Sequence, residues 1–167
     1  MQSKPSNDDI QRLLATVALC FDKADEHFSR RFDRPQSNFK QRGRAAGTAY
    51  LQRNELRFNY FMFLQDKEHF LQTVVPHEVS HIIVYQLFGA NVRPHGVEWR
   101  GVMQAVFACK AERTHTFAVP TPKRAFTYRC ECREHLLSVR RHAKTTKGVE
   151  YLCRQCKAKL TFLHEFL

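Results

Sequence analysis

The residues with the clearest chemical signature are His77-Glu78-Val79-Ser80-His81. Side chains four positions apart project from the same side of an α-helix, so His77 and His81 can direct two imidazoles at one metal ion. Zinc suits this pair, because catalytic zinc takes three protein ligands and keeps one position for water. Glu78 is the expected general base. The motif predicts attack of a zinc-bound water on a peptide carbonyl, with Glu78 carrying the proton.

A third ligand is needed to complete such a site. His95 is the leading candidate, because Pro94 and Gly96 flank it and favour a turn before the next helix. Glu98 is the rival, since a carboxylate from a later helix also serves in zinc peptidases, and spacing alone does not separate the two. His115 is a weaker third option.

The cysteines near the C-terminus suggest a second metal site. Cys153 and Cys156 have the two-residue gap of a zinc knuckle, and an upstream pair is expected to complete it. Cys130 and Cys132 are separated by one residue, so either both bind the metal or His135 replaces one of them. Free thiols on a hairpin are the simpler alternative. We expect a structural zinc, because so short a segment cannot build a sufficient core unaided.

Apolar residues recur at helical spacing after Gln65, and Gly89 supplies a C-terminal stop. This pattern predicts the helix that carries the histidine motif. Its apolar side faces away from the histidines, so one face can be buried while the other faces a cleft. Pro76 should kink this helix or restart it. The side opposite the histidines holds Val75, Val79, Ile82 and Gln86.

The remaining pattern predicts an α+β fold. We expect an amphipathic opening helix from Ser6, short antiparallel strands between Arg34 and Tyr60, and a further helix from about Gly96. Pro120-Thr121-Pro122 reads as a linker, because proline is excluded from helix interiors and central strands. The predicted domains are residues 1–120 and 121–167. Single cysteines at positions 20 and 109 are expected to be structural.

The chain is strongly basic. Its 27 Lys and Arg against 16 Asp and Glu give a formal charge of +11 and a pI near 9.7. From Lys123 to Lys159, eleven basic residues face three acidic ones, a difference of +8. This concentration favours nucleic acid as a partner, although a solvated basic face is the plainer alternative. The expected phosphate contacts, on the strands and turn between the knuckles, are Arg140, Arg141, Lys144 and Lys147.

The N-terminal residues and the lengths of the apolar runs indicate whether the protein is secreted or inserted in a membrane. Residues 1–9 are polar, and no apolar run approaches the roughly 18 residues that a membrane span requires. Without a signal sequence, the six cysteines are expected to be thiols or metal ligands rather than disulfides. We therefore expect a cytoplasmic protein that does not insert into membranes.

At this point the chain resembles the SprT proteins of bacteria, which are relatives of the Spartan proteases. The matching segments are Gln41–Gly43, Ala46–Ala49, Val74–Glu78, His81, Pro94–Gly96, Glu98–Trp99, Arg113–His115 and Tyr128–Cys130. The resemblance implies one catalytic zinc on His77, His81 and His95, and a zincin-like metalloprotease domain followed by a zinc ribbon. Ser80 stands where the family more often has alanine, a change expected to be harmless.

Two functions remain open at this stage. Spartan-type members are DNA-dependent proteases, so the resemblance favours a zinc metalloendopeptidase that acts on DNA-associated proteins, brought to DNA by its basic ribbon. The alternative is a zinc-containing DNA-binding regulator without significant peptidase activity. A nuclease is disfavoured, because the sequence offers no carboxylate cluster for two-metal chemistry.

Overall fold

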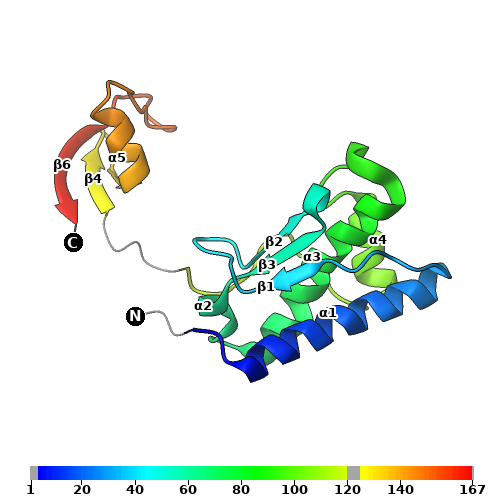
Figure 1. Ribbon diagram of the computed structural model, residues 1–167. Coiled ribbons are helices and arrows are strands. Elements are labelled where there is room, and N and C mark those ends of the chain that lie inside the picture. The colour runs from blue at the N-terminus through cyan, green and yellow to red at the C-terminus, as the bar shows by residue number, and fades with distance from the viewer. Residues whose placement is uncertain (1–3, 120–124, 167) are drawn as a thin grey trace. The chain divides into compact units, whose positions relative to one another are not determined.

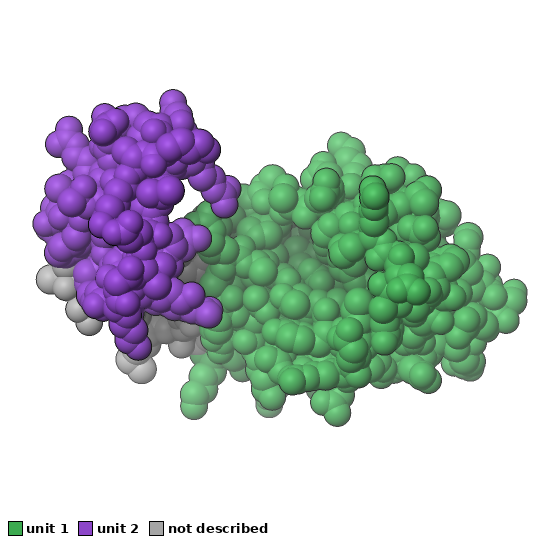
Figure 2. Space-filling model, turned by 90° about the horizontal axis from the view of Figure 1, so that it is seen from above, with its two compact units in different colours: residues 1–120 green, residues 121–167 purple. Residues whose placement is uncertain are grey.

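The computed structural model describes residues 4–119 and 125–166. The chain forms two compact units, Met1–Pro120 and Thr121–Leu167, which Figure 2 colours separately. The predicted linker Pro120–Pro122 lies outside the described residues, as do the first two basic residues of the tail, Lys123 and Arg124. No helix within the described ranges is long and apolar enough to cross a membrane.

The first unit places helices against a small sheet (Figure 1). Its helices are α1 (Asn7–Phe28), α2 (Tyr60–Phe63), α3 (Lys67–Phe88) and α4 (Val97–Ala105). Its strands are β1 (Gln36–Asn38), β2 (Gly47–Tyr50) and β3 (Glu55–Phe58), with 3-10 turns η1 (Leu51–Arg53) and η2 (Gly89–Asn91). The opening helix begins where predicted, because Ser6 caps it by accepting a hydrogen bond from the backbone N–H of Asp9.

The prediction of antiparallel strands was wrong for one pair. The strand order is β1-β3-β2, and β1 runs parallel to β3, whereas β2 and β3 are antiparallel. The chain reverses once between β1 and β2 and again between β2 and β3. After two reversals β3 runs in the same direction as β1. The two outer strands, β1 and β2, therefore run in opposite directions on either side of β3. This arrangement leaves β2 as one edge of the sheet.

Helix α3 is continuous from Lys67 to Phe88 and does not restart at Pro76. Proline lacks the N–H that would bond to the carbonyl four residues earlier, which here belongs to Gln72. The Cys109 thiol lies 3.5 Å from that carbonyl oxygen and 3.3 Å from the carbonyl oxygen of Phe107, so its single proton can go to either. A donor from outside the helix is therefore within reach of the carbonyl that the proline leaves free, which fits the structural role expected of Cys109.

A large apolar core lies between these helices and the sheet, and its biggest fully buried side chains include Phe21, Phe58, Phe63, Phe70 and Trp99. Helix α3 contributes most of one wall, and it contacts α1, α4 and β2. The helix that carries the histidine motif is therefore anchored on several sides by burial of apolar surface.

The second unit is a three-stranded antiparallel sheet of order β5-β4-β6, formed by β4 (Ala125–Arg129), β5 (Glu134–Ser138) and β6 (Thr161–Phe166). A short helix, α5 (Val139–Thr145), follows β5. Its described core is small, with Phe126, Tyr128 and Leu137 buried and Tyr151 and Leu160 packed against them. So little apolar burial calls for an additional cross-link.

Candidate metal centres

Three histidines converge in the first unit. His77 and His81 project from α3, and His95 projects from the turn before α4. The Nε2 atom of His95 lies 3.0 Å from Nε2 of His77 and 3.1 Å from Nε2 of His81. Tetrahedral zinc with bonds of about 2.05 Å would separate two such nitrogens by about 3.3 Å. The donor set and its spacing therefore fit a zinc ion.

The backbone around His95 is shaped to bring it there. His95 has a left-handed φ of 58°, and the N–H of Gly96 donates to the carbonyl of Arg93 over 2.8 Å. A Cβ at position 96 would lie 2.8 Å from that carbonyl oxygen and 2.8 Å from Oε2 of Glu98. Only glycine fits this tight turn, which points the preceding imidazole toward α3.

The three imidazoles are held in the neutral form that binds metal. Burial, and then the neighbouring His95, lower the pKa of His77 to about 4. Burial also lowers the pKa of His81, to about 3, with His77 and His95 adding to the effect. The pKa of His95 is lowered by burial and by the charge of Arg113. Neutral rings keep a lone pair available for a cation.

Trp99 packs against the rings of all three histidines. Its ring centroid lies 4.7 Å from that of His77, 5.6 Å from that of His81 and 4.6 Å from that of His95. Its indole N–H donates to the backbone carbonyl of His77 over 3.2 Å. The side chain is fully buried. From the sequence Trp99 was named only within the matching segment Glu98–Trp99, and no role in the site was predicted for it.

Glu78 lies between α3 and the edge strand β2, and only 7% of it is exposed. Burial raises its pKa to about 8, against the lowering effect of a hydrogen bond from the backbone of Ala49. A cation held by the histidines would favour the ionised carboxylate. Gly47 makes room for the side chain, since a Cβ there would lie 2.5 Å from Cγ of Glu78.

The structure brings His95, rather than Glu98 or His115, to the two histidines of the motif. Glu98 bends back over Gly96. His115 directs Nε2 at the backbone carbonyl of Arg44, 3.0 Å away, and its ring lies beside Phe117. Within the described residues its Nδ1 is buried without a partner.

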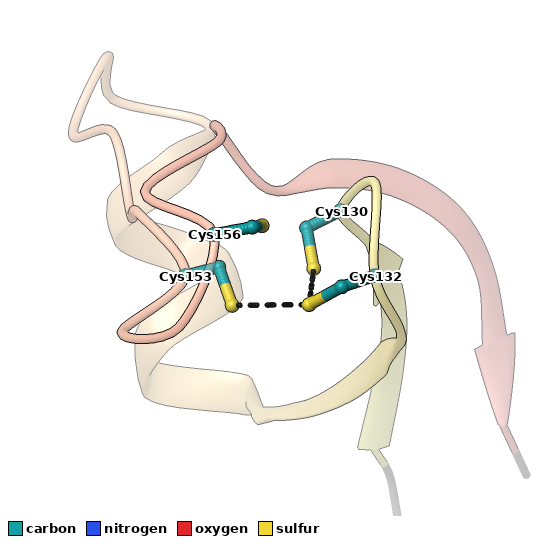
Figure 3. A group of neighbouring side chains, drawn as sticks. All are labelled: Cys130, Cys132, Cys153 and Cys156. Atoms are coloured by element: carbon teal, nitrogen blue, oxygen red, sulfur yellow. Dashed lines mark hydrogen bonds between the residues drawn. The ribbon is translucent and has the colours of Figure 1, made fainter.

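Four cysteines gather in the second unit (Figure 3). Sγ of Cys132 lies 3.4 Å from that of Cys130 and 3.7 Å from that of Cys153, and all four sulfurs, including that of Cys156, lie within 4.8 Å of one another. Sulfurs around tetrahedral zinc are separated by about 3.8 Å. The cluster therefore fits a structural zinc ion.

His135 accompanies this cluster instead of replacing a cysteine. Its Nε2 lies 3.1 Å from Sγ of Cys130. Burial opposes ionisation of that thiol, but the hydrogen bond from His135 and those from the backbone of Cys132 and Arg133 outweigh it and lower its pKa to about 5. A thiolate is the form that binds metal, so His135 acts here as a supporting neighbour.

The four predicted phosphate-contacting residues are all exposed, but they do not lie on strands. Arg140, Arg141 and Lys144 belong to helix α5, and Lys147 follows in the next turn. The expectation of strands was wrong because Ser138 caps a helix, accepting from the N–H of Arg141 over 3.4 Å. A single short helix therefore presents most of these charges.

Comparison with known proteins agrees with these two units. The SprT-like family model matches residues 17–116, and the SprT-like zinc ribbon domain matches residues 124–163. The chain belongs to the SprT-like family. The first match contains the three histidines and Glu78, and the second contains the four cysteines.

Curated relatives extend the similarity over most of the chain. A Protein SprT of Pseudomonas aeruginosa is 44% identical over 163 residues, covering 94% of this chain and 98% of its own length. The Protein SprT of Vibrio parahaemolyticus is 46% identical over 145 residues, covering 86% and 87%. That of Yersinia pseudotuberculosis is 45% identical over 142 residues, covering 84% and 83%. No solved structure matches the chain.

Proposed function

We propose that this SprT-like protein is a zinc metalloendopeptidase that acts on DNA-associated proteins. The observation that carries the proposal is the buried carboxylate of Glu78 beside three converging neutral histidines. Such a set matches the ligands and general base of a hydrolytic zinc site. His77, His81 and His95 would hold the metal.

Zinc supplies Lewis acidity to such a site, polarising a carbonyl and making water a nucleophile near neutral pH. The remaining work belongs to the chain. Ionised Glu78 accepts the proton of the attacking water and delivers it to the leaving amine. Trp99 and the backbone of Glu112, which hydrogen-bonds to His77, fix the orientation of the histidines.

Strand β2 offers a way to bind a polypeptide. It forms an edge of its sheet, and Ala49 on this strand hydrogen-bonds to Glu78. An extended peptide can add to a sheet edge through main-chain hydrogen bonds. A substrate bound there would bring a scissile bond close to Glu78, with little demand on side-chain identity.

The DNA part of the proposal rests on charge. Helix α5 and the following turn expose Arg140, Arg141, Lys144 and Lys147, and the whole chain carries a formal charge of +11. Lysine and arginine bind backbone phosphates without regard to base sequence. A DNA-binding regulator without peptidase activity would share this property, so cleavage is the feature that separates the two.

The decisive variant is Glu78→Gln, which keeps the size of the side chain but removes the base. We expect zinc content and DNA affinity to stay unchanged, and cleavage of a protein substrate incubated with DNA to fall by about 100-fold or more. Glu26→Gln on the exposed side of α1 is the matched control and should cleave normally. If wild type and Glu78→Gln are equally inert, the chain is a regulator and not a peptidase.

A further inference from the structure

A basic hollow adjoins the third histidine of the first unit. It has a volume of about 550 Å³ and is formed by the segment 91–97, the first turns of α4 and Arg113. Three arginines line it: Arg93, Arg100 and Arg113. The only acidic residue among its lining residues is Glu98, so the hollow carries a formal charge of about +2.

The arginines are not committed to partners inside the protein. Arg100 makes one long hydrogen bond, 3.5 Å, to the backbone carbonyl of His95. Across the ranges that the structure describes, the guanidinium groups of Arg93 and Arg113 have neither a hydrogen bond nor an ion pair. All three side chains are exposed. Their donors are therefore available to an external anion.

Two further features favour an anion at this place. Helix α4 begins beside the hollow at Gly96, whose cap position has no side-chain hydrogen bond, so the first N–H groups of the helix lack a side-chain acceptor. Arg113 and His95 both line the hollow, so positive charge borders the histidine site. The anion would thus lie next to the histidine site.

We propose that this hollow, which we call the arginine hollow, binds backbone phosphates of a nucleic-acid strand and holds that strand beside His95. Several guanidinium forks match the multiple oxygens of a phosphate, and the volume exceeds the needs of one carboxylate. The strongly basic chain favours a polyanion over a single acidic side chain. The inference rests on the DNA association in the proposed function but not on peptide cleavage.

The test compares DNA binding by full-length, zinc-loaded variants. Arg93→Gln/Arg113→Gln removes two charges from the arginine hollow. Arg31→Gln/Arg53→Gln removes two exposed charges elsewhere in the same unit. A single-stranded oligonucleotide of mixed sequence is titrated by fluorescence anisotropy at several salt concentrations, with no protein substrate present.

We expect the hollow variant to bind about tenfold more weakly and the slope of log affinity against log salt to fall in magnitude by about 1.4, the value for two phosphate contacts on a single strand. The control should stay within about twofold of wild type, because distant exposed charges are screened. Repeating the comparison in an Arg140→Gln/Arg141→Gln/Lys144→Gln background should give the same difference, since the arginine hollow and α5 would contribute separately.

Equal affinity and slope in the hollow variant and its control would overturn the proposal. So would unchanged DNA binding combined with a selective loss of cleavage of acidic peptides, which would mark the arginine hollow as a subsite for acidic side chains. Inorganic phosphate should displace the oligonucleotide only at ionic strengths where chloride does. Displacement well below that would assign the arginine hollow to free phosphate instead. Only the experiment with acidic peptides requires peptide cleavage. The DNA-binding and phosphate-displacement measurements do not.

Discussion

At the scale of single residues, the position of the Glu78 carboxylate depends on the absence of a side chain at Gly47. Gly47 on β2 faces Glu78 so closely that a Cβ would lie 2.5 Å from Cγ and 2.8 Å from Oε1. Glu78 is buried and has little space to move aside. The glycine therefore limits where the Glu78 carboxylate can lie.

Replacing Gly47 with alanine should displace Glu78 without touching the three histidines. We expect zinc content to be retained and protein cleavage to fall by about 100-fold, because a shift of about 1 Å in a catalytic group costs roughly that factor. Zinc analysis and a cleavage assay on the same preparation measure both quantities.

Gly101→Ala provides the matched control. Gly101 lies within α4, and a Cβ there would meet no atom within 4 Å. Alanine in an exposed helix position is favourable by about 1 kcal/mol, so this variant should remain active. Equal activity of the two variants would show that Glu78 does not depend on the space at Gly47.

Some of these residues could be predicted from the sequence and others could not. Helical geometry places residues four positions apart on the same side, so the pairing of His77 with His81 could be predicted directly from the sequence. The approach of His95 needed the resemblance, because spacing could not separate it from Glu98. The contacts of Gly47 with Glu78 and of Trp99 with His77 and His81 join residues far apart in the chain. No local pattern encodes such contacts.

At the scale of elements, Asp9 joins the start of α1 to the rest of the first unit. Its carboxylate accepts from Lys67 over 2.6 Å and from the hydroxyl of Tyr60 over 2.8 Å, and the residue is 2% exposed. Burial raises the pKa of Asp9, but the hydrogen bonds from Lys67, Tyr60 and Ser6 together outweigh it and leave the pKa below its usual value.

This pKa predicts how stability depends on pH. A depressed folded-state pKa stabilises the protein above the unfolded-state value of about 3.9 and loses this effect as pH falls through the folded-state value. Asp9→Asn should therefore cost about 2 kcal/mol at pH 7, and the difference from wild type should shrink below about pH 4.

Urea unfolding followed by tryptophan fluorescence measures this stability difference for the first unit of the structure, because Trp99 is the chain's single tryptophan. Asp8→Asn is the control, since Asp8 is exposed in the same first turn. It should behave as wild type at both pH values. If the loss of stability in Asp9→Asn relative to wild type stays unchanged down to pH 3, the lowered pKa of Asp9 is contradicted.

The elements themselves were only partly predictable. Helix α1 was found from its apolar period, since burial of one face imposes it. Helix α3 was found from the spacing of its apolar residues and the stop at Gly89, although the structure buries it on more than one face. The parallel pairing of β1 with β3 was missed because three- and four-residue strands carry almost no pairing information. Helix α5 was missed because a seven-residue segment rich in charge has no apolar period, and only the Ser138 cap marks its start.

At the scale of the whole molecule, the two units have different reasons to be stable. The first has an extensive apolar core, whereas the described core of the second consists of three buried residues and two partners. Metal binding supplies folding free energy to small domains of the second kind. We therefore expect loss of the cysteine site to unfold the second unit and leave the first intact.

We propose that this chain holds two separate zinc ions, one on three histidines and one on four cysteines. The most direct test is zinc stoichiometry of the purified full-length protein, measured beside His81→Ala and Cys153→Ser. We expect two equivalents in wild type and one in each variant, with the fluorescence of Trp99 unchanged in Cys153→Ser. One equivalent in wild type, or two in either variant, would contradict the claim.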